Sequence, residues 1–178
     1  MMYVTGKLMV LTLSLGLIGT AVADQKCDSS LPATTPDARF TDNGDGTVTD
    51  SVAGLMWKKC LEGMSGSSCS AGQEQKFTWQ TALQRASSEA SMTSLGYTDW
   101  RLPNVKELAT IAELRCHSPA ANLTVFPNLP ADIDVNLSLL WSSSPSTENA
   151  FAWGVQFIEG DVAQANKNNI GFVRLVRN

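Results

Sequence analysis

The residues of this chain that are best suited to chemistry are a histidine beside a cysteine. His117 is the only histidine, and it directly follows Cys116. Nucleophilic catalysis needs a nucleophile, a base and a group that orients the base, all within hydrogen-bond reach. Side chains of adjacent residues point apart in most backbone conformations, and Cys116 would be oxidised in an exported protein. The sequence therefore predicts a protein that is not an enzyme and needs no cofactor.

A short row of two acids and an asparagine is a candidate metal-binding site. Asp132, Asp134 and Asn136 alternate with apolar residues and would share one side of an extended segment, where three oxygen ligands could hold Ca²⁺. Leu137 stands where a calcium loop has glycine, which favours a polar edge that faces water. Residues 42–46 read Asp-Asn-Gly-Asp-Gly, but the chelating carboxylate expected further along the loop is missing. We predict no metal site, and the row of acids is the remaining calcium candidate.

The first 23 residues have the composition of a signal peptide. Lys7 precedes an apolar run over residues 8–18, and residues 21–23 form a small-residue cleavage site. The apolar run is shorter than the roughly 20 residues that a membrane span needs. We therefore expect an exported bacterial protein that meets the membrane only before cleavage. Its final location would be periplasmic, cell-surface or secreted.

The charge balance narrows the choice of partner. After cleavage the chain has 12 basic and 17 acidic residues, and its longest basic run is Lys58-Lys59. A nucleic-acid partner requires a basic stripe that releases counterions, so we expect none. The same argument weighs, less strongly, against sulfated glycans. With 43% hydrophobic residues, the chain can bury the core of one domain.

Four cysteines allow three disulfide pairings. Cys60 and Cys69 flank a loop rich in glycine and serine, and their short closure makes this pair the first choice. Cys27 is then left for Cys116, which would tie an N-terminal arm to the end of a helix and stabilise the fold by about 2–4 kcal/mol. A zinc site is the alternative, but the spacing contains no C-x-x-C knuckle.

Two helices are predicted from their caps and their apolar spacing. Thr78 caps a stripe of apolar residues at helical spacing within residues 79–90. Asn104 and Glu107 form a capping box before a second stripe within residues 105–112. Each helix has one apolar face, so both can pack on a β layer.

Short strands account for most of the remaining chain. The glycine-containing turn at residues 42–46 predicts a tight hairpin over residues 38–50. The last third predicts a meander of strands, over residues 139–143, 150–157, 159–162 and 172–177. Residues 117–139 contain three prolines and form a connection that is long for a compact domain. Such connections are usually functional or disordered, and we expect this one to lie exposed where a ligand can reach it.

The start of the second helix also carries a resemblance. Trp100-Arg101-Leu102-Pro103-Asn104 followed by Lys-Glu-Leu is similar to the central motif of the Legionella collagen-like protein C-terminal domain family (Lcl_C). The resemblance covers residues 37–178, after an N-terminal arm at residues 24–36. Further blocks are similar in the same order: Arg39-Phe40 through Asp50, Gly54-Leu55-Met56-Trp57-Lys58-Lys59-Cys60, Phe77-Thr78-Trp79, Phe126-Pro127, Trp141-Ser142-Ser143-Ser144 and Val173-Arg174-Leu175-Val176-Arg177.

This resemblance implies an α+β, C-type-lectin-like fold, in which two helices pack on short antiparallel strands beside a long loop region. It also implies a distant similarity to the formylglycine-generating-enzyme domain, through Arg101-Leu102-Pro103 and Gly171-Phe172-Val173-Arg174. The cysteine placement of those enzymes is not matched, so this similarity concerns the fold and not the chemistry.

The lectin-like resemblance further implies a binding module for carbohydrate or another extracellular polymer, with a role in adhesion. Sugar rings stack on aromatic faces, and their hydroxyl groups need polar partners. The candidate ligand-binding residues are Asn122, Asp132, Asp134, Asn136, Trp141, Glu148 and Trp153. For each tryptophan the alternative is a place in the core.

The alternative function is a structural or protein-interaction subunit of a surface assembly. A concave site with an aromatic floor and several carboxamides would favour the carbohydrate. A contiguous exposed apolar patch would favour the protein partner.

Overall fold

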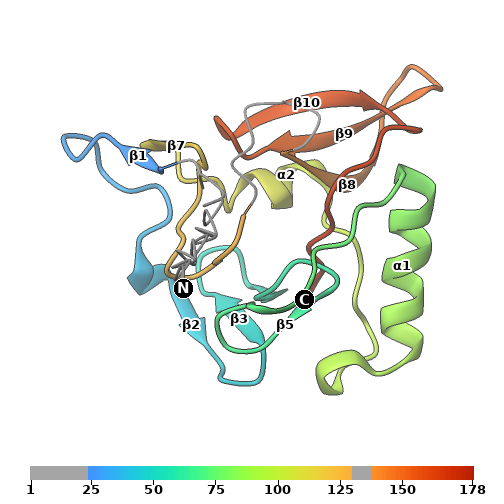
Figure 1. Ribbon diagram of the computed structural model, residues 1–178, viewed down its shortest axis with the longest axis horizontal. Coiled ribbons are helices and arrows are strands. Elements are labelled where there is room, and N and C mark those ends of the chain that lie inside the picture. The colour runs from blue at the N-terminus through green and yellow to red at the C-terminus, as the bar shows by residue number, and fades with distance from the viewer. Residues whose placement is uncertain (1–23, 130–137) are drawn as a thin grey trace, which may run out of the picture.

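The computed structural model describes residues 24–129 and 138–178 (Figure 1). The predicted signal peptide at residues 1–23 lies outside the described residues. So do three of the candidate ligand residues, Asp132, Asp134 and Asn136.

The described chain is an α+β structure, as predicted, and its strand pairings are antiparallel. One sheet has the order β11-β4-β3-β2 and a second has the order β10-β9-β8. Their strands are β2 (Phe40–Asp42), β3 (Thr47–Asp50), β4 (Leu55–Lys58), β11 (Val176–Arg177), β8 (Leu139–Pro145), β9 (Phe151–Gln156) and β10 (Asp161–Asn166). Two small ribbons pair β1 (Lys26–Cys27) with β7 (Cys116–His117), and β5 (Met64–Ser65) with β6 (Ala71–Gly72). Short 3-10 turns, η1 (Asp37–Arg39) and η2 (Ser94–Gly96), complete the described elements.

The predicted hairpin is confirmed by the pairing of β2 with β3. Phe40 lies opposite Asp50, and the turn between the strands contains Gly44 and Gly46 with φ values of 77° and 91°. Residues with side chains rarely adopt these angles, which explains the glycines. This turn forms one side of the candidate site.

Helix α1 (Trp79–Ser91) begins as predicted, because the Thr78 side chain accepts a hydrogen bond from the backbone N–H of Thr81. Its buried residues are Ala82, Ala86 and Glu89, which share one face. The helix therefore presents a carboxylate on its inner side. Figure 1 shows α1 as a separate wall beside the strands.

Helix α2 (Val105–Ala109) has the predicted capping box but is shorter than its apolar stripe. The hydroxyl of Thr110 donates to the carbonyl oxygen of Glu107, and the chain then leaves the helix. Ala112 instead forms a β-bridge with Ala121. The predicted apolar stripe therefore extends beyond the end of the helix, because these later contacts replace the helical ones.

The long connection after β7 does not behave as an exposed loop over its described part, residues 118–129. Phe126 is fully buried and meets the rings of Phe40 and Trp57 edge-on, with centroid distances of 5.4 and 6.5 Å. Val125 and Leu129 are buried in the same core cluster. The expectation of a solvent-exposed segment is wrong here, because its apolar side chains fill the space beside the first sheet.

The last segment of the chain is also different from its prediction. Only Val176 and Arg177 pair as a strand, and they pair with β4 rather than with the meander of β8, β9 and β10. The carbonyl of Phe172 accepts from the N–H of Trp141, and the carbonyl of Leu175 accepts from the N–H of Lys58. This segment therefore joins the two sheets.

Two disulfides close the fold, Cys27–Cys116 and Cys60–Cys69, in the predicted pairing. The first holds β1 against β7 and ties down the N-terminal arm. Glu113 adds to this tie, since its carboxylate accepts from the backbone N–H groups of Thr34 and Thr35. No helix in the described part of the chain is long and apolar enough to cross a membrane.

Candidate functional site

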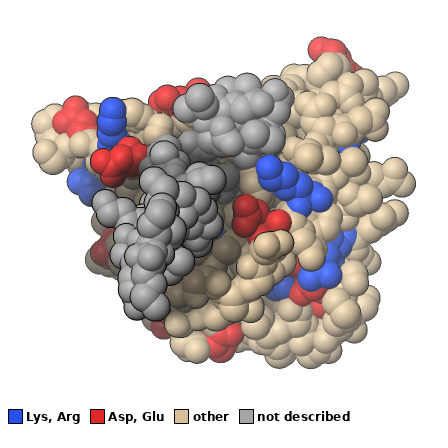
Figure 2. All heavy atoms as spheres, in the orientation of Figure 1, with Lys and Arg blue, Asp and Glu red and all other residues tan. Residues whose placement is uncertain are grey.

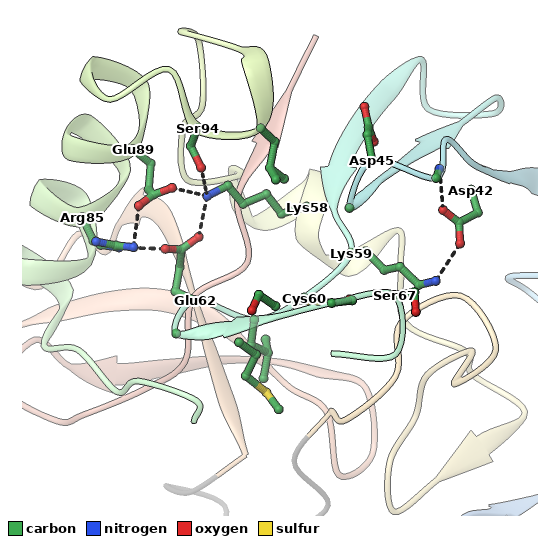
Figure 3. A pocket seen from close by; sticks show the side chains of 18 residues that line it. Asp42, Asp45, Lys58, Lys59, Cys60, Glu62, Ser67, Arg85, Glu89 and Ser94 are labelled. Atoms are coloured by element: carbon green, nitrogen blue, oxygen red, sulfur yellow. Dashed lines mark hydrogen bonds and ion pairs between the residues drawn. The ribbon is translucent and has the colours of Figure 1, made fainter. Parts of the chain in front are cut away.

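A cavity with a volume of about 580 Å³ lies between α1, the β2–β3 turn and the loop that follows β4 (Figure 3). Pockets that bind small molecules usually measure roughly 300–1,000 Å³. Its walls carry acids and bases from parts of the chain that are far apart in sequence. This cavity is therefore the candidate site, and we call it the charged pocket.

Four side chains form a closed charge network on one side of the charged pocket, and we call them the quartet: Lys58, Glu62, Arg85 and Glu89. Nζ of Lys58 lies 3.0 Å from Oε1 of Glu62, and Nε of Arg85 lies 2.7 Å from Oε2 of the same carboxylate. Glu89 forms ion pairs with both bases. The quartet thus ties β4, the loop after it and α1 together (Figure 3).

Local structure explains why these charges meet. Trp57 of β4 points into the core, so the next residue, Lys58, points to the other face. The Lys58 ammonium lies 5.5 Å from the centroid of the Trp100 ring and donates to the hydroxyl of Ser94 at 2.9 Å. Glu89 meets it from the inner face of α1. Strand alternation and helical periodicity therefore deliver opposite charges to one place.

One carboxyl of the quartet, that of Glu89, has a shifted pKa. Burial raises the pKa of Glu89, but hydrogen bonds from Lys58 and Ser94, with the charges of Lys58 and Arg85, outweigh it and place the pKa below its ordinary value. By its ion pairs the quartet matches two acidic side chains with two basic ones. Removing one member of a buried ion pair typically costs about 3–5 kcal/mol, so the quartet also holds the pocket in shape.

Arg85 is the quartet member that faces the ligand space most openly. All three donors of the Lys58 ammonium are taken by Glu62, Glu89 and Ser94. Arg85 uses Nε and Nη2 on the two acids, and the described residues provide no partner for Nη1. Its side chain is 30% exposed, against 9% or less for the other three. A ligand oxygen can therefore reach Arg85.

The opposite rim of the pocket comes from the β2–β3 turn. Nζ of Lys59 lies 2.6 Å from Oδ2 of Asp42, and this hydrogen bond, followed by one from the Gly44 N–H, lowers the pKa of the Asp42 carboxyl. Asp45 uses Oδ1 on Thr47 in the turn. Because each carboxylate has two oxygens, Asp45 retains acceptor capacity toward the pocket.

The third wall is the loop that the Cys60–Cys69 disulfide closes. All residues from Cys60 to Ser67 line the pocket. Gly63 has a φ of 92°, and a Cβ atom there would lie 2.3 Å from the carbonyl oxygen of Gln73. Only glycine fits this position. The wall therefore depends on a short cross-link and a close approach of two backbones.

Arg174 supports the same wall from within the core. It is completely buried, and its Nη1 donates to the carbonyl oxygens of Lys58 and Lys59. Burial lowers the pKa of its guanidinium to about 9, so the group still carries its charge at neutral pH. It positions the end of β4, from which both lysines enter the pocket.

The predicted ligand residues that the structure describes are not brought together in one site. Trp141 is fully buried, and its indole N–H donates to the carbonyl of Phe77 at 2.8 Å, so its prediction as a stacking surface is corrected. The Asn122 amide donates to Thr35 and Asp37, which holds the N-terminal arm.

Two further candidates share one hairpin. Trp153 is half-buried on β9, and Glu148 is exposed in the turn that precedes this strand. The remaining three, Asp132, Asp134 and Asn136, lie outside the described residues.

A second, smaller hollow lies beside β9 and β10, with a volume of about 170 Å³. Its lining combines an aromatic ring with four carboxamides: Phe151, Gln156, Gln164, Asn166 and Asn169. Gln164 is paired with Trp153 across the two strands. The chemistry matches that expected for a sugar, but the volume is below the usual range for a complete ligand pocket.

The sequence interpretation missed the charged pocket. None of the quartet residues is among the candidate ligand residues predicted from the sequence. The spacing of Glu89 in the sequence could have indicated this site. Glu89 lies three and seven residues after the buried Ala86 and Ala82, and this helical spacing places its carboxylate on the apolar face.

On the face of the molecule in Figure 2, basic and acidic side chains are interspersed. The described residues on this face form no broad basic stripe.

Comparison with known proteins identifies one family. The Lcl C-terminal domain family matches residues 46–177. The matched range includes the quartet, both cysteines of the pocket wall and Arg174, and it begins just after Asp42 and Asp45. A comparison with curated proteins finds no match.

Proposed function

The chain belongs to the Lcl C-terminal domain family, and from this premise we propose that it is an exported, non-enzymatic module that binds carbohydrate or another polyhydroxylated polymer at the bacterial cell surface. The charged pocket is its binding site. The observation that carries this proposal is the alternation of donors and acceptors around one cavity, with Arg85 and Lys59 as donors and Asp45 as an acceptor.

A sugar hydroxyl can donate one hydrogen bond and accept others. Neighbouring hydroxyls on one ring therefore suit a wall on which cations and carboxylates stand side by side. Arg85 Nη1 can donate to one sugar oxygen while Asp45 accepts from another. Such a wall is also held rigid by the quartet, which lowers the entropy lost on binding.

The described lining of the charged pocket contains no aromatic side chain. Binding of a single sugar would therefore depend on hydrogen bonds and would be weak. A polymer that repeats the same sugar raises the effective concentration and compensates for this weakness. This favours an extracellular polymer over a free monosaccharide as the ligand.

The two disulfides support the exported location, because such bonds form and persist in oxidising compartments. The predicted signal peptide agrees with this location. The proposed adhesive role requires this location.

A protein-interaction role is the second candidate, and exposed apolar side chains favour it. Leu114 and Val162 are 63% and 47% exposed. Leu114 approaches Gly160, which stands two residues before Val162, so the two side chains lie in one region of the surface. A patch of this kind can contact another protein of a surface assembly.

A glycan array tests the proposed function. The exported and oxidised protein is applied with calcium and with a chelator, and we expect binding to polyhydroxylated glycans that is equal in both conditions. Arg85→Lys retains the charge but removes the free Nη1 donor, and we expect binding to fall roughly tenfold or more, as for the loss of a charged hydrogen bond. Arg115→Lys makes the same change near β7 and should bind like the wild type. Absence of glycan binding by the wild type would contradict the proposal.

A further inference from the structure

We infer that Glu62 and Glu89 are specificity-determining residues, which restrict the charged pocket to uncharged polyhydroxylated ligands and exclude sulfated or carboxylated glycans. This inference rests on the proposed function and names the class of ligand that it accepts.

The two bases of the quartet would by themselves make an anion site. Lys58 and Arg85 both reach the pocket, and a guanidinium beside an ammonium is a typical site for sulfate, phosphate or carboxylate. The acids prevent this use. Each of Glu62 and Glu89 contacts both bases, so every oxygen of the two carboxylates is placed against a cation.

Burial makes this neutralisation effective. The side chains of Glu62 and Glu89 are 3% and 6% exposed, so neither water nor salt screens them as they would at the surface. An anion that approaches Arg85 would lose its hydration while meeting two carboxylates directly behind the guanidinium. The attraction of the anion to the bases and its repulsion from the acids then cancel. No favourable interaction offsets the free energy that the anion loses on dehydration.

On the opposite rim of the pocket, formed by the β2–β3 turn, the base is also paired with an acid. Lys59 is paired with Asp42, and Asp45 adds one more carboxylate. The described lining of the pocket therefore holds three bases and four acids. Each base is paired with an acid, so none is left to bind an anion. An uncharged hydroxyl loses little hydration on entering the pocket, and it can use the free Arg85 donor and the remaining acceptor positions of the carboxylates.

The test removes the negative charge of each acid and retains the size of its side chain. Glu89→Gln and Glu62→Gln retain the side-chain volume and leave one positive charge unbalanced. Both variants and the wild type are applied to an array of neutral glycans and heparin-derived oligosaccharides, at low and high salt. Glu159→Gln is the matched control, because Glu159 is exposed in the β9–β10 turn.

We expect the wild type and Glu159→Gln to bind neutral glycans and to leave heparin oligosaccharides unbound. Each pocket variant should gain at least tenfold in heparin binding, and this gain should disappear at high salt. Equal binding of heparin and neutral glycans by the wild type would overturn the inference, as would a folded Glu89→Gln variant that gains none.

Two outcomes separate this inference from the proposed function. If the wild type binds no neutral glycan but Glu89→Gln acquires heparin binding, the proposed function fails and the charge argument stands. If the buried variants do not fold, Asp42→Asn releases Lys59 at the exposed rim and should produce a smaller gain in heparin binding. A folded Asp42→Asn variant without that gain would also overturn the inference.

Discussion

Nε of Arg85 lies 2.7 Å from Oε2 of Glu62, which connects α1 directly to the loop that the Cys60–Cys69 disulfide closes. One contact therefore joins the helical wall of the charged pocket to its cross-linked wall. The shape of the pocket depends on both walls, and this dependence leads to the first prediction.

The two disulfides should have different roles. Cys60 and Cys69 are 9 residues apart, and Cys27 and Cys116 are 89 apart. Loop-closure entropy assigns about 2.7 kcal/mol to the short bond and about 4.6 kcal/mol to the long one. Replacing Cys60 and Cys69 with serine should abolish glycan binding at a modest loss of stability. Replacing Cys27 and Cys116 should cost more stability and spare binding.

Urea unfolding and the glycan array, performed on both double variants, provide the measurement. The two variants serve as controls for each other, because each removes one bond and leaves the other intact. Retention of full binding without Cys60–Cys69 would show that the loop holds its position by other contacts.

Trp141 and Trp153 should respond differently to substitution. Trp141→Ala removes a fully buried ring and one of the two hydrogen bonds that the Phe77 carbonyl accepts, so the free energy of unfolding should fall by about 3–5 kcal/mol. Trp153 is only half-buried, and Trp153→Ala should cost clearly less. Thermal melts followed by circular dichroism compare the two, and equal losses would place both rings in the core.

The capping box of α2 should contribute measurably. Asn104→Ala removes the side-chain oxygen that accepts from the Glu107 N–H, and the expected cost is about 1 kcal/mol. Asn104→Asp retains an acceptor and should remain near the wild type. Urea midpoints measure both variants. If alanine were as stable as aspartate, the cap would contribute nothing in this short helix.

Stability should decrease in acid partly through Asp50. Burial raises the pKa of Asp50, but hydrogen bonds from Arg39 and from the Ala53 N–H, with the Arg39 charge, place it below its ordinary value of 3.8. The folded state therefore holds its proton less tightly than the unfolded state. This stabilisation is complete above pH 3.8 and is lost as the pH falls through the lower folded pKa.

Unfolding of the wild type and of Asp50→Asn by urea, from pH 2.5 to 7, checks this prediction. At pH 7 the variant leaves Arg39 unpaired, with an expected cost of about 3 kcal/mol. Its stability should change less with pH than that of the wild type. Parallel curves would show that Asp50 titrates alike in both states.

Local rules explain what the sequence predicted correctly about the fold. The caps at Thr78 and Asn104, the glycine turn of the hairpin and the disulfide pairing all depend on residues close in sequence or on simple elimination. The end of α2 and the pairing of the last strand depend on distant partners. Val176 pairs with Trp57, and no local pattern indicates that choice.

The candidate site was less accessible to sequence reasoning for the same reason. Its quartet combines a strand residue, a loop residue and two helix residues, which meet only after α1 has packed. The buried Phe126 shows the opposite error, since the prolines of its connection predict an exposed segment although the apolar side chains there pack into the core. In both cases tertiary packing decided the outcome.

The most direct test of the central claim locates the bound glycan. The exported and oxidised protein, labelled with ¹⁵N, is titrated with the neutral glycan that the array identifies, and the shifts of backbone and side-chain signals are recorded. We predict the largest shifts at the Arg85 side chain and at Asp45 and Lys59. Shifts confined to Trp153 and the hollow beside β9 and β10, or no shift at all, would contradict the account.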